Sequence, residues 1–188
     1  MSSSQLVHSR TEGKLDVWKR AADFLTFLRV IISFLIALYA KLAREFDPLI
    51  MSLMVISGWG TDLFDGQFAR RSKTRTDTWV GRHDGEIDLF FAFSIWFALY
   101  ILGRISIEVF FSFPFLVGVA KAILKTKAVF QIGMAGSYGA FIFKVASQKR
   151  AALETVIAWI VLTVLVDPKK AKKEVTGFLK EISSIFEK

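Results

Sequence analysis

Apolar residues along this chain gather in six long runs that polar and charged segments separate. The runs lie near residues 24–43, 48–66, 84–103, 107–124, 126–146 and 150–166. A helix needs about 17 to 25 mostly apolar residues to cross the hydrocarbon core of a bilayer. The pattern therefore predicts an all-α integral membrane protein with six transmembrane helices. No internal repeat or low-complexity segment divides the chain, so we expect a single domain over 1–188 with a membrane core at 24–166.

Two amphipathic segments flank this core. Residues 14–23, KLDVWKRAAD, combine apolar and basic positions in a way that predicts a short helix lying in the membrane interface before the first span. Residues 169–188 begin with KKAKK and continue with apolar residues at helical spacing, which predicts a cytoplasmic amphipathic tail over 167–188. The polar segment 1–22 lacks the apolar run of a secretory signal, so we expect it to stay in the cytoplasm.

Composition agrees with a membrane protein and limits its chemistry. The chain is 53% hydrophobic with 19 Phe, and its mean hydropathy is +0.45. It has no Cys and only two His, which excludes thiolate metal sites and disfavours imidazole sites. A metal in this protein would therefore be held by oxygen ligands.

The basic residues predict the orientation in the membrane. Most of the 25 Lys and Arg lie in the segments that six spans place on the side of the N-terminus. By the positive-inside rule this side is cytoplasmic. The net charge of +8 is thus explained by topology, and no basic run carries a nucleic-acid motif, so we expect no nucleic-acid partner.

Four aspartates mark the cytoplasmic ends of the second and third spans. Asp62 and Asp65 are three residues apart, and Asp84 and Asp88 are four apart, so each pair shares one face of its helix. Carboxylates this close raise each other's pKa unless a cation compensates them. Mg²⁺ or Mn²⁺, held as a two-metal site, is the expected cation because hard divalent ions prefer carboxylate oxygens and serve phosphoryl chemistry.

Small and basic residues accompany these acids. Gly66 and Ala69 lack bulk and would open the helix surface beside the metals, and Arg70 could fork onto a phosphate. The pattern D-x₂-D-G-x₂-A-R followed by D-x₃-D resembles the signature of the CDP-alcohol phosphatidyltransferase family. The segment from Asp23 to Arg29, DFLTFLR, is similar to a second family element, Asn-x-Leu-Thr-x-x-Arg, with Asp in place of Asn.

The resemblance implies a function in phospholipid biosynthesis. A CDP-linked diacyl or ether lipid would donate its phosphatidyl group to the hydroxyl of a small polar alcohol, and CMP would leave. Asp62, Asp65, Asp84 and Asp88 would bind the metals, and Asp88 would also act as the catalytic base. Thr26, Asp62, Gly66, Ala69 and Arg70 would hold the nucleotide and its diphosphate. The resemblance also implies a homodimer.

The acceptor is the least determined part of this hypothesis. A phosphorylated polyol such as glycerol 3-phosphate is weakly favoured, because Arg71, Arg82, Lys121 and Lys125 lie on the expected side and could bind its phosphate. The chain has thirteen residues between Arg70 and Asp84, where the family pattern has twelve, and Gly81 stands three residues before Asp84. We place the extra residue in the loop before the third span. Alternatives are a divalent-cation-binding or transporting protein and an inactive family member.

Overall fold

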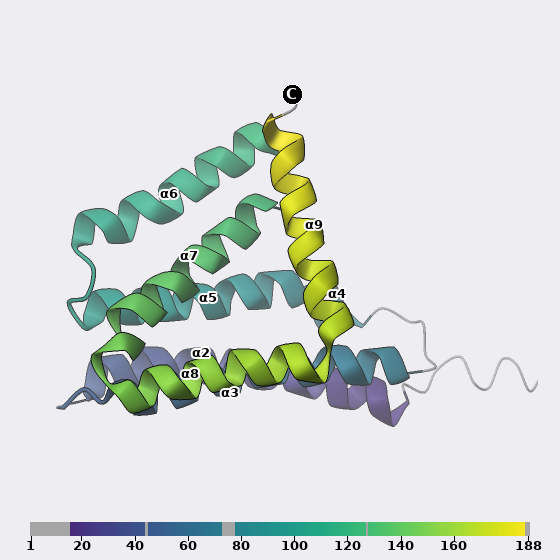
Figure 1. Ribbon diagram of the computed structural model, residues 1–188, viewed down its shortest axis with the longest axis horizontal. Helices are drawn as coiled ribbons and strands as arrows, with labels where there is room; N and C mark the ends of the chain where they lie inside the picture. Colours follow the sequence, from purple (N-terminus) through teal and green to yellow (C-terminus); the bar gives the residue numbers. More distant parts are fainter. Residues whose placement is uncertain (1–15, 44, 73–77, 127, 187–188) are drawn as a thin grey trace, which may run out of the picture.

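A computed structural model describes residues 16–43, 45–72, 78–126 and 128–186, and every element in this part of the chain is helical (Figure 1). The helices are α2 Val17–Leu42, α3 Pro48–Arg71, α4 Trp79–Arg82, α5 Asp84–Ile101, α6 Ile107–Leu124, α7 Ala128–Lys144, the short 3₁₀ helix η1 Ala146–Gln148, α8 Arg150–Val166 and α9 Pro168–Phe186. Each of the six apolar runs of the sequence forms a long helix. The all-α prediction is therefore confirmed for the described residues.

Three of the described segments are long and apolar enough to cross a membrane, judged by length and composition: Val17–Leu42, Ile107–Leu124 and Ala128–Gln148. The other long helices in the apolar runs differ from these in clear ways. α5 carries three carboxylates in its 18 residues, α8 has only 17 residues, and α3 includes the polar and small residues SGWGTD. The chain is thus a membrane protein with three clear candidate spans.

The N-terminal segment departs from the sequence-based expectation. Residues 17–23 do not form a separate interfacial helix, because they are the first turns of α2. The Asp16 side chain caps this helix by accepting a hydrogen bond from the Lys19 amide at 2.8 Å. Trp18 contacts Phe68 of α3 with ring centroids 5.5 Å apart, and Ala22 is buried. Ala22 thus packs against protein, whereas the side chains of Val17 and Trp18 are 78% and 42% exposed.

Helix α2 is the centre of the bundle, with α3 and α5 packed against it. Its residues Ile32, Ile36 and Ala40 join a core that extends into five further elements. The members from α3, α5, α7, η1 and α8 include Met51, Val55, Phe91, Ile95, Leu99, Phe141, Ala146 and Val156. This apolar core holds α3 and α5 on α2, so it fixes the positions of the aspartates that these two helices carry.

Helices α6 and α9 lie at the periphery (Figure 1). α6 has no buried residue and packs mainly against α7. α9 leaves the end of α8 and runs past the ends of α5 and α7, on the side where α3 ends and α5 begins. The predicted helical tail is thus confirmed, and it lies at the same end of the bundle as the four aspartates.

Candidate functional site

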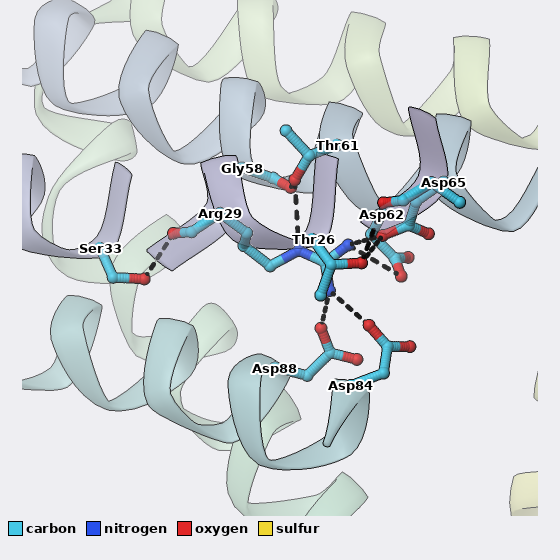
Figure 2. A network of polar contacts seen from close by, with 10 residues as sticks. Thr26, Arg29, Ser33, Gly58, Thr61, Asp62, Asp65, Asp84 and Asp88 are labelled. Carbon is cyan, nitrogen blue, oxygen red and sulfur yellow. Dashed lines mark hydrogen bonds and ion pairs between the residues drawn. The ribbon is translucent and has the colours of Figure 1, made fainter. Parts of the chain in front are cut away.

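The four aspartates predicted from the sequence gather around one buried cation, Arg29 of α2 (Figure 2). Arg29 Nη2 lies 2.6 Å from Asp65 Oδ2 and 3.5 Å from Asp62 Oδ1. Its Nη1 lies 3.5 Å from Asp84 Oδ1 and also contacts Asp88 Oδ1. One nitrogen thus faces the pair from α3 and the other faces the pair from α5.

The guanidinium of Arg29 is fully engaged by these partners. Its Nε donates to Thr61 Oγ1 at 3.2 Å, and its two Nη atoms donate to Asp62, Asp65 and Asp88. The contact of Nη1 with Asp84 at 3.5 Å is an ion pair. The side chain is 1% exposed. A buried charge needs such complete pairing, because desolvation without partners is very costly. Arg29 therefore links α2, α3 and α5 through a single rigid group.

A close approach of α3 to α5 permits this arrangement. A Cβ atom on Gly58 would lie 2.2 Å from Cζ of Phe91, so only glycine leaves room for that ring. Phe91 is 1% exposed and one turn beyond Asp88 on α5. Gly58 is one turn before Asp62 on α3. The contact between Gly58 and Phe91 therefore sets the separation of the two aspartate pairs.

Thr26 lies one turn before Arg29 and supports the same carboxylates. Its hydroxyl is 3.1 Å from Asp65 Oδ2 and 3.2 Å from the carbonyl oxygen of Ala22. The hydroxyl has one hydrogen, so it donates to one of these acceptors at a time. The sequence predicts Thr26 as part of a nucleotide pocket, and the structure places it, 5% exposed, as a partner of Asp65.

Two cavities meet beside the carboxylates. The smaller, which we call the polar chamber, has a volume of about 190 Å³ and is lined by Arg29, Gly58, Trp59, Asp62, Asp88, Phe91, Met134 and Tyr138. The larger, the apolar cavity, has a volume of about 410 Å³ and lies between α3, α7, α8 and the start of α9. Trp59, Asp62 and Tyr138 line both cavities. Asp62 therefore borders a small charged space and a larger apolar one, and Asp88 borders the charged space, whereas Asp65 and Asp84 line neither cavity.

Several predicted site residues lie away from these cavities. Gly66 and Ala69 follow Asp65 on α3 and line neither cavity. Arg70 lies at the end of the same helix, and its Nη2 is 2.7 Å from Oδ2 of Asp167, the residue between α8 and α9. Arg70 thus ties α3 to the α8–α9 junction, and the apolar cavity includes Asp167 in its lining.

The four basic residues proposed for an acceptor phosphate are also not brought to the carboxylates. Arg71 lies over the ring of Trp18, with Cζ 5.6 Å from its centroid. Lys121 donates to the carbonyl oxygen of Thr126 at 2.9 Å, at the turn between α6 and α7. Arg82 and Lys125 are exposed at the ends of α4 and α6. None of the four lines the polar chamber or the apolar cavity.

The first turns of α2 hold both described ends of the connection between α3 and α5. Ser72 donates to Asp16 Oδ2 at 3.0 Å, and Thr78 donates to Asp23 Oδ1 at 2.8 Å. Thr78 also caps α4 by accepting from the amide of Gly81. Asp23 occupies the position where the resembling family element has Asn, and its carboxylate positions the start of α4, directly before α5. The extra residue is expected in the segment TRTDTW, residues 74–79, of which 74–77 lie outside the described residues.

The chemistry of the donor set fits a divalent metal. Asp62, Asp65, Asp84 and Asp88 offer only carboxylate oxygens, which Mg²⁺ and Mn²⁺ prefer. Four carboxylates against one guanidinium leave a formal surplus of three negative charges. Within the described residues no three acidic or imidazole groups close around a common point, because the guanidinium stands between the two pairs (Figure 2). The charge favours bound cations, and the side chains would have to turn partly away from Arg29 to hold them.

Sequence reasoning found the acids but missed several of their neighbours. Arg29 was recognised only as the last residue of a motif and as one of many cations. Trp59, Tyr138 and Met134 lie within the predicted spans, and no motif of the sequence singles them out. The segment Gly58-Trp59-Gly60 was the available signal, because two glycines around a large ring one turn before Asp62 indicate close packing next to the site.

Comparisons with known proteins give no match: no family model matches the sequence, and no curated protein or solved structure matches it. The resemblance to the CDP-alcohol phosphatidyltransferases therefore depends on the residues of the signature. The structure adds that the four signature aspartates, which come from two helices, meet at one cation.

Proposed function

We propose that this protein is a metal-dependent CDP-alcohol phosphatidyltransferase, which moves a phosphatidyl group, or its ether-lipid equivalent, from a CDP-lipid to a small polar alcohol. The observation that carries the proposal is the convergence of Asp62, Asp65, Asp84 and Asp88 on Arg29, beside two adjoining cavities that Asp62 and Asp88 line. These four acids belong to the D-x₂-D-G-x₂-A-R and D-x₃-D pattern, and their surroundings suit a substrate with a charged head group and a hydrocarbon tail.

The apolar cavity suits the lipid part of the donor. Its lining includes Leu63, Ile142, Trp159, Ile160 and Val164, and it reaches Asp62 at one point. A hydrocarbon chain gains free energy roughly in proportion to the apolar area it buries. A donor whose chain entered this cavity would have its diphosphate near Asp62. The diphosphate would then face the carboxylates, where the reaction takes place.

The polar chamber suits the acceptor hydroxyl. Asp88 lines this chamber and would take the proton from the hydroxyl as the oxygen attacks the lipid-linked phosphorus. The new P–O bond forms as the P–O bond to the second phosphate breaks, and CMP carries away the electron pair of the broken bond. Arg29 and Thr26 hold the acids in place during this exchange, because they bind Asp88 and Asp65 without contacting bulk water.

Mg²⁺ or Mn²⁺, held by Asp62, Asp65, Asp84 and Asp88, would polarise the diphosphate and stabilise the charge of the leaving CMP. Arg29 remains a fixed positive charge beside these acids, so it limits how much divalent charge the site attracts. Arg70 lies beyond the cavities, so its proposed contact with the diphosphate would require it to leave Asp167. Gly66 and Ala69 also lie beyond the cavities, in the last turns of α3.

The proposal includes the arrangement in the membrane. Six helices, α2, α3, α5, α6, α7 and α8, would cross the bilayer with both termini and the carboxylates on the cytoplasmic side, where a soluble nucleotide product can leave. α9 would lie along the cytoplasmic surface, which its course past the ends of α5 and α7 supports (Figure 1). A homodimer is part of the proposal through the family resemblance.

The test is CMP release by purified protein. The protein would be reconstituted with Mg²⁺ or Mn²⁺, CDP-diacylglycerol or its ether analogue, and a panel of alcohols. We expect CMP release with at least one alcohol and its loss in Asp88→Asn, in which the amide oxygen can still accept from Arg29. Asp47→Asn is the matched control, because Asp47 caps the opposite end of α3 and Asn is an equally good cap.

The contrary outcome is equally clear. Folded protein that releases no CMP with either metal, either donor and any alcohol would refute the transferase. Uptake of Mn²⁺ into liposomes by the same preparation would then favour the cation transporter. Uptake is the less expected result, because Met51, Val55, Ile95 and Leu99, deeper along α3 and α5, are buried and apolar and offer an ion no polar path.

A further inference from the structure

The polar chamber carries information about the acceptor that the sequence did not reveal. Its volume of about 190 Å³ limits it to a small molecule. Among the described residues, its lining contains two carboxylates, Asp62 and Asp88, and a single cation, Arg29. The chemistry of this lining, which rests on the proposed function, decides which kind of alcohol can reach Asp88.

Among the residues that the structure describes, an anionic acceptor would find no available cation in this chamber. Arg29 already donates four hydrogen bonds within the protein, to Thr61, Asp62, Asp65 and Asp88, and forms an ion pair with Asp84. The four basic side chains that the sequence offered, Arg71, Arg82, Lys121 and Lys125, line neither cavity. Oxyanions such as phosphate are normally held by charge-assisted hydrogen bonds from arginine or lysine, and none of the described residues around the chamber provides one.

The net charge of the aspartate cluster around Arg29, which borders the chamber, acts in the same direction. Four carboxylates against one guanidinium leave a negative surplus, and negative charge repels an approaching anion. The diphosphate of the donor would neutralise the positive charge of bound metal ions. These ions would therefore not form a second binding site for an anion. A phosphorylated alcohol would therefore enter against an unfavourable field.

The remaining walls of the chamber are aromatic. Trp59 meets Tyr138 edge to face with centroids 5.4 Å apart, and Phe91 lies 6.4 Å from Tyr138. Aromatic faces attract cations and pack well against the C–H groups of neutral molecules, whereas their negative faces repel anions. Met134 adds an adaptable apolar wall on α7. These groups suit an alcohol of neutral or positive charge.

We infer that the acceptor alcohol carries no negative charge and binds in the polar chamber between Trp59, Phe91, Met134, Tyr138 and Asp88. The class includes neutral polyols and amino alcohols, and it excludes phosphorylated alcohols such as glycerol 3-phosphate. The carboxylates and aromatic rings thus disfavour glycerol 3-phosphate, the acceptor that the basic residues of the sequence had favoured.

Matched pairs of acceptors test this inference. CMP release from CDP-lipid with Mg²⁺ or Mn²⁺ would be compared for glycerol against glycerol 3-phosphate and for inositol against inositol phosphate, with ethanolamine as the cationic member. We expect at least one uncharged or cationic alcohol to react, with a preference of roughly tenfold or more over its phosphorylated partner. A phosphorylated alcohol that reacts as well as its parent would overturn the inference and leave the transferase intact. No release with any alcohol would refute the proposed function itself, and the inference with it.

Binding without turnover locates the acceptor. Calorimetric titration of the preferred alcohol into the metal-loaded protein would be repeated with Met134→Phe, which fills the polar chamber, and with Ile160→Phe, which fills only the apolar cavity. We expect Met134→Phe to weaken alcohol binding by roughly tenfold and Ile160→Phe to leave it unchanged while raising the KM for the CDP-lipid. Equal effects of the two variants on alcohol binding would show that the acceptor lies elsewhere. If Met134→Phe does not fold, the comparison of acceptor pairs with the unaltered protein still decides the inference.

Discussion

The two ends of α3 each carry an ion-pair cluster, and they differ in almost every physical respect. Near the C-terminal end, Asp62 and Asp65 meet Arg29, which is 1% exposed and joins three helices. At the N-terminal end, Asp47 meets Lys149 at 3.0 Å, with side chains 37% and 45% exposed. The first cluster has a buried central cation and an unbalanced charge, although the side chains of Asp62 and Asp84 are 47% and 43% exposed. The second is an exposed pair of opposite charges.

The difference shows where charge is used for function. An exposed pair contributes little, because water screens it and long side chains lose entropy in holding it. A buried cluster with surplus charge is costly to form, and loss of its central cation leaves carboxylates without compensation. A chain that keeps four such acids beside two cavities retains a feature that stability alone does not require.

The largest expected effect comes from removing the central cation. Arg29→Met keeps the length of the side chain and removes its charge, so four carboxylates face one another uncompensated. We expect the protein to lose about 3 kcal/mol of stability, measured by thermal unfolding in detergent without divalent metal. Added Mg²⁺ should restore part of the loss, because it supplies the missing positive charge.

The conservative variant Arg29→Lys separates the effect of the charge from that of the planar guanidinium. Lysine keeps the charge but cannot reproduce the planar fork, so we expect an intermediate loss of stability. An Arg29→Met protein as stable as the wild type, with or without metal, would show that the cluster has no need of its cation.

The next effect comes from the close approach that brings the two aspartate pairs together. Gly58→Ala places a methyl group against the ring of Phe91, which must shift, and overpacking of this kind costs about 2 kcal/mol. The measurement is the midpoint of thermal unfolding. Gly118→Ala on α6 is the control, because a Cβ there meets nothing within 4 Å. Equal behaviour of the two variants would contradict the role assigned to Gly58.

A cluster of intermediate burial should give an intermediate effect. Asp23 accepts from Thr78 and lies 3.8 Å from Lys19, with its side chain 19% exposed. Asp23→Ala removes the acceptor that fixes the start of α4, and we expect a loss of about 1 kcal/mol. Asp23→Asn, which keeps an acceptor oxygen and matches the family element, should lose less. Equal stability of the Asp23→Ala and Asp23→Asn proteins would show that the acceptor oxygen of residue 23 does not stabilise the fold.

The smallest effect belongs to the exposed pair. Lys149→Ala should change the unfolding midpoint by much less than any of the variants above, and added salt should reduce the change further. The pKa of Asp47 lies below its usual value, because the amide of Leu49 and the side chain of Lys149 both favour its charged form. A depressed carboxyl pKa stabilises the fold above the unfolded-state value, and this contribution disappears as the pH falls through the folded-state value. The effect of Lys149→Ala should therefore vanish in acid, as unfolding measured from pH 6 downward would reveal.

The local part of this site follows from the sequence alone. Spacings of three and four residues place Asp62 with Asp65 and Asp84 with Asp88 on common faces, and all four do reach one guanidinium. Helical periodicity is a property of a short segment, so it needs no knowledge of the fold. The six long helices follow for the same reason, since each is one continuous apolar run.

Contacts between segments far apart in the chain could not be predicted from the sequence. Nothing near Arg29 in the sequence shows that α2 lies between α3 and α5, so its four partners required the tertiary structure. The pair of Arg70 and Asp167 joins positions 97 residues apart. The amphipathic pattern at 14–23 predicts a separate interfacial helix, whereas residues 17–23 are the start of α2. Periodicity indicates an apolar face, but not whether the helix continues into the next span.

The order of these elements along the chain has a consequence for how the protein is made. Arg29 belongs to α2, and the four acids follow it in α3 and α5. Chains emerge from the ribosome N-terminus first, so the counter-charge is already present when each acidic helix is synthesised. A circular permutant that moved α2 to the C-terminus would keep every contact of the finished site, yet its nascent chain would carry four uncompensated carboxylates until the final helix appeared.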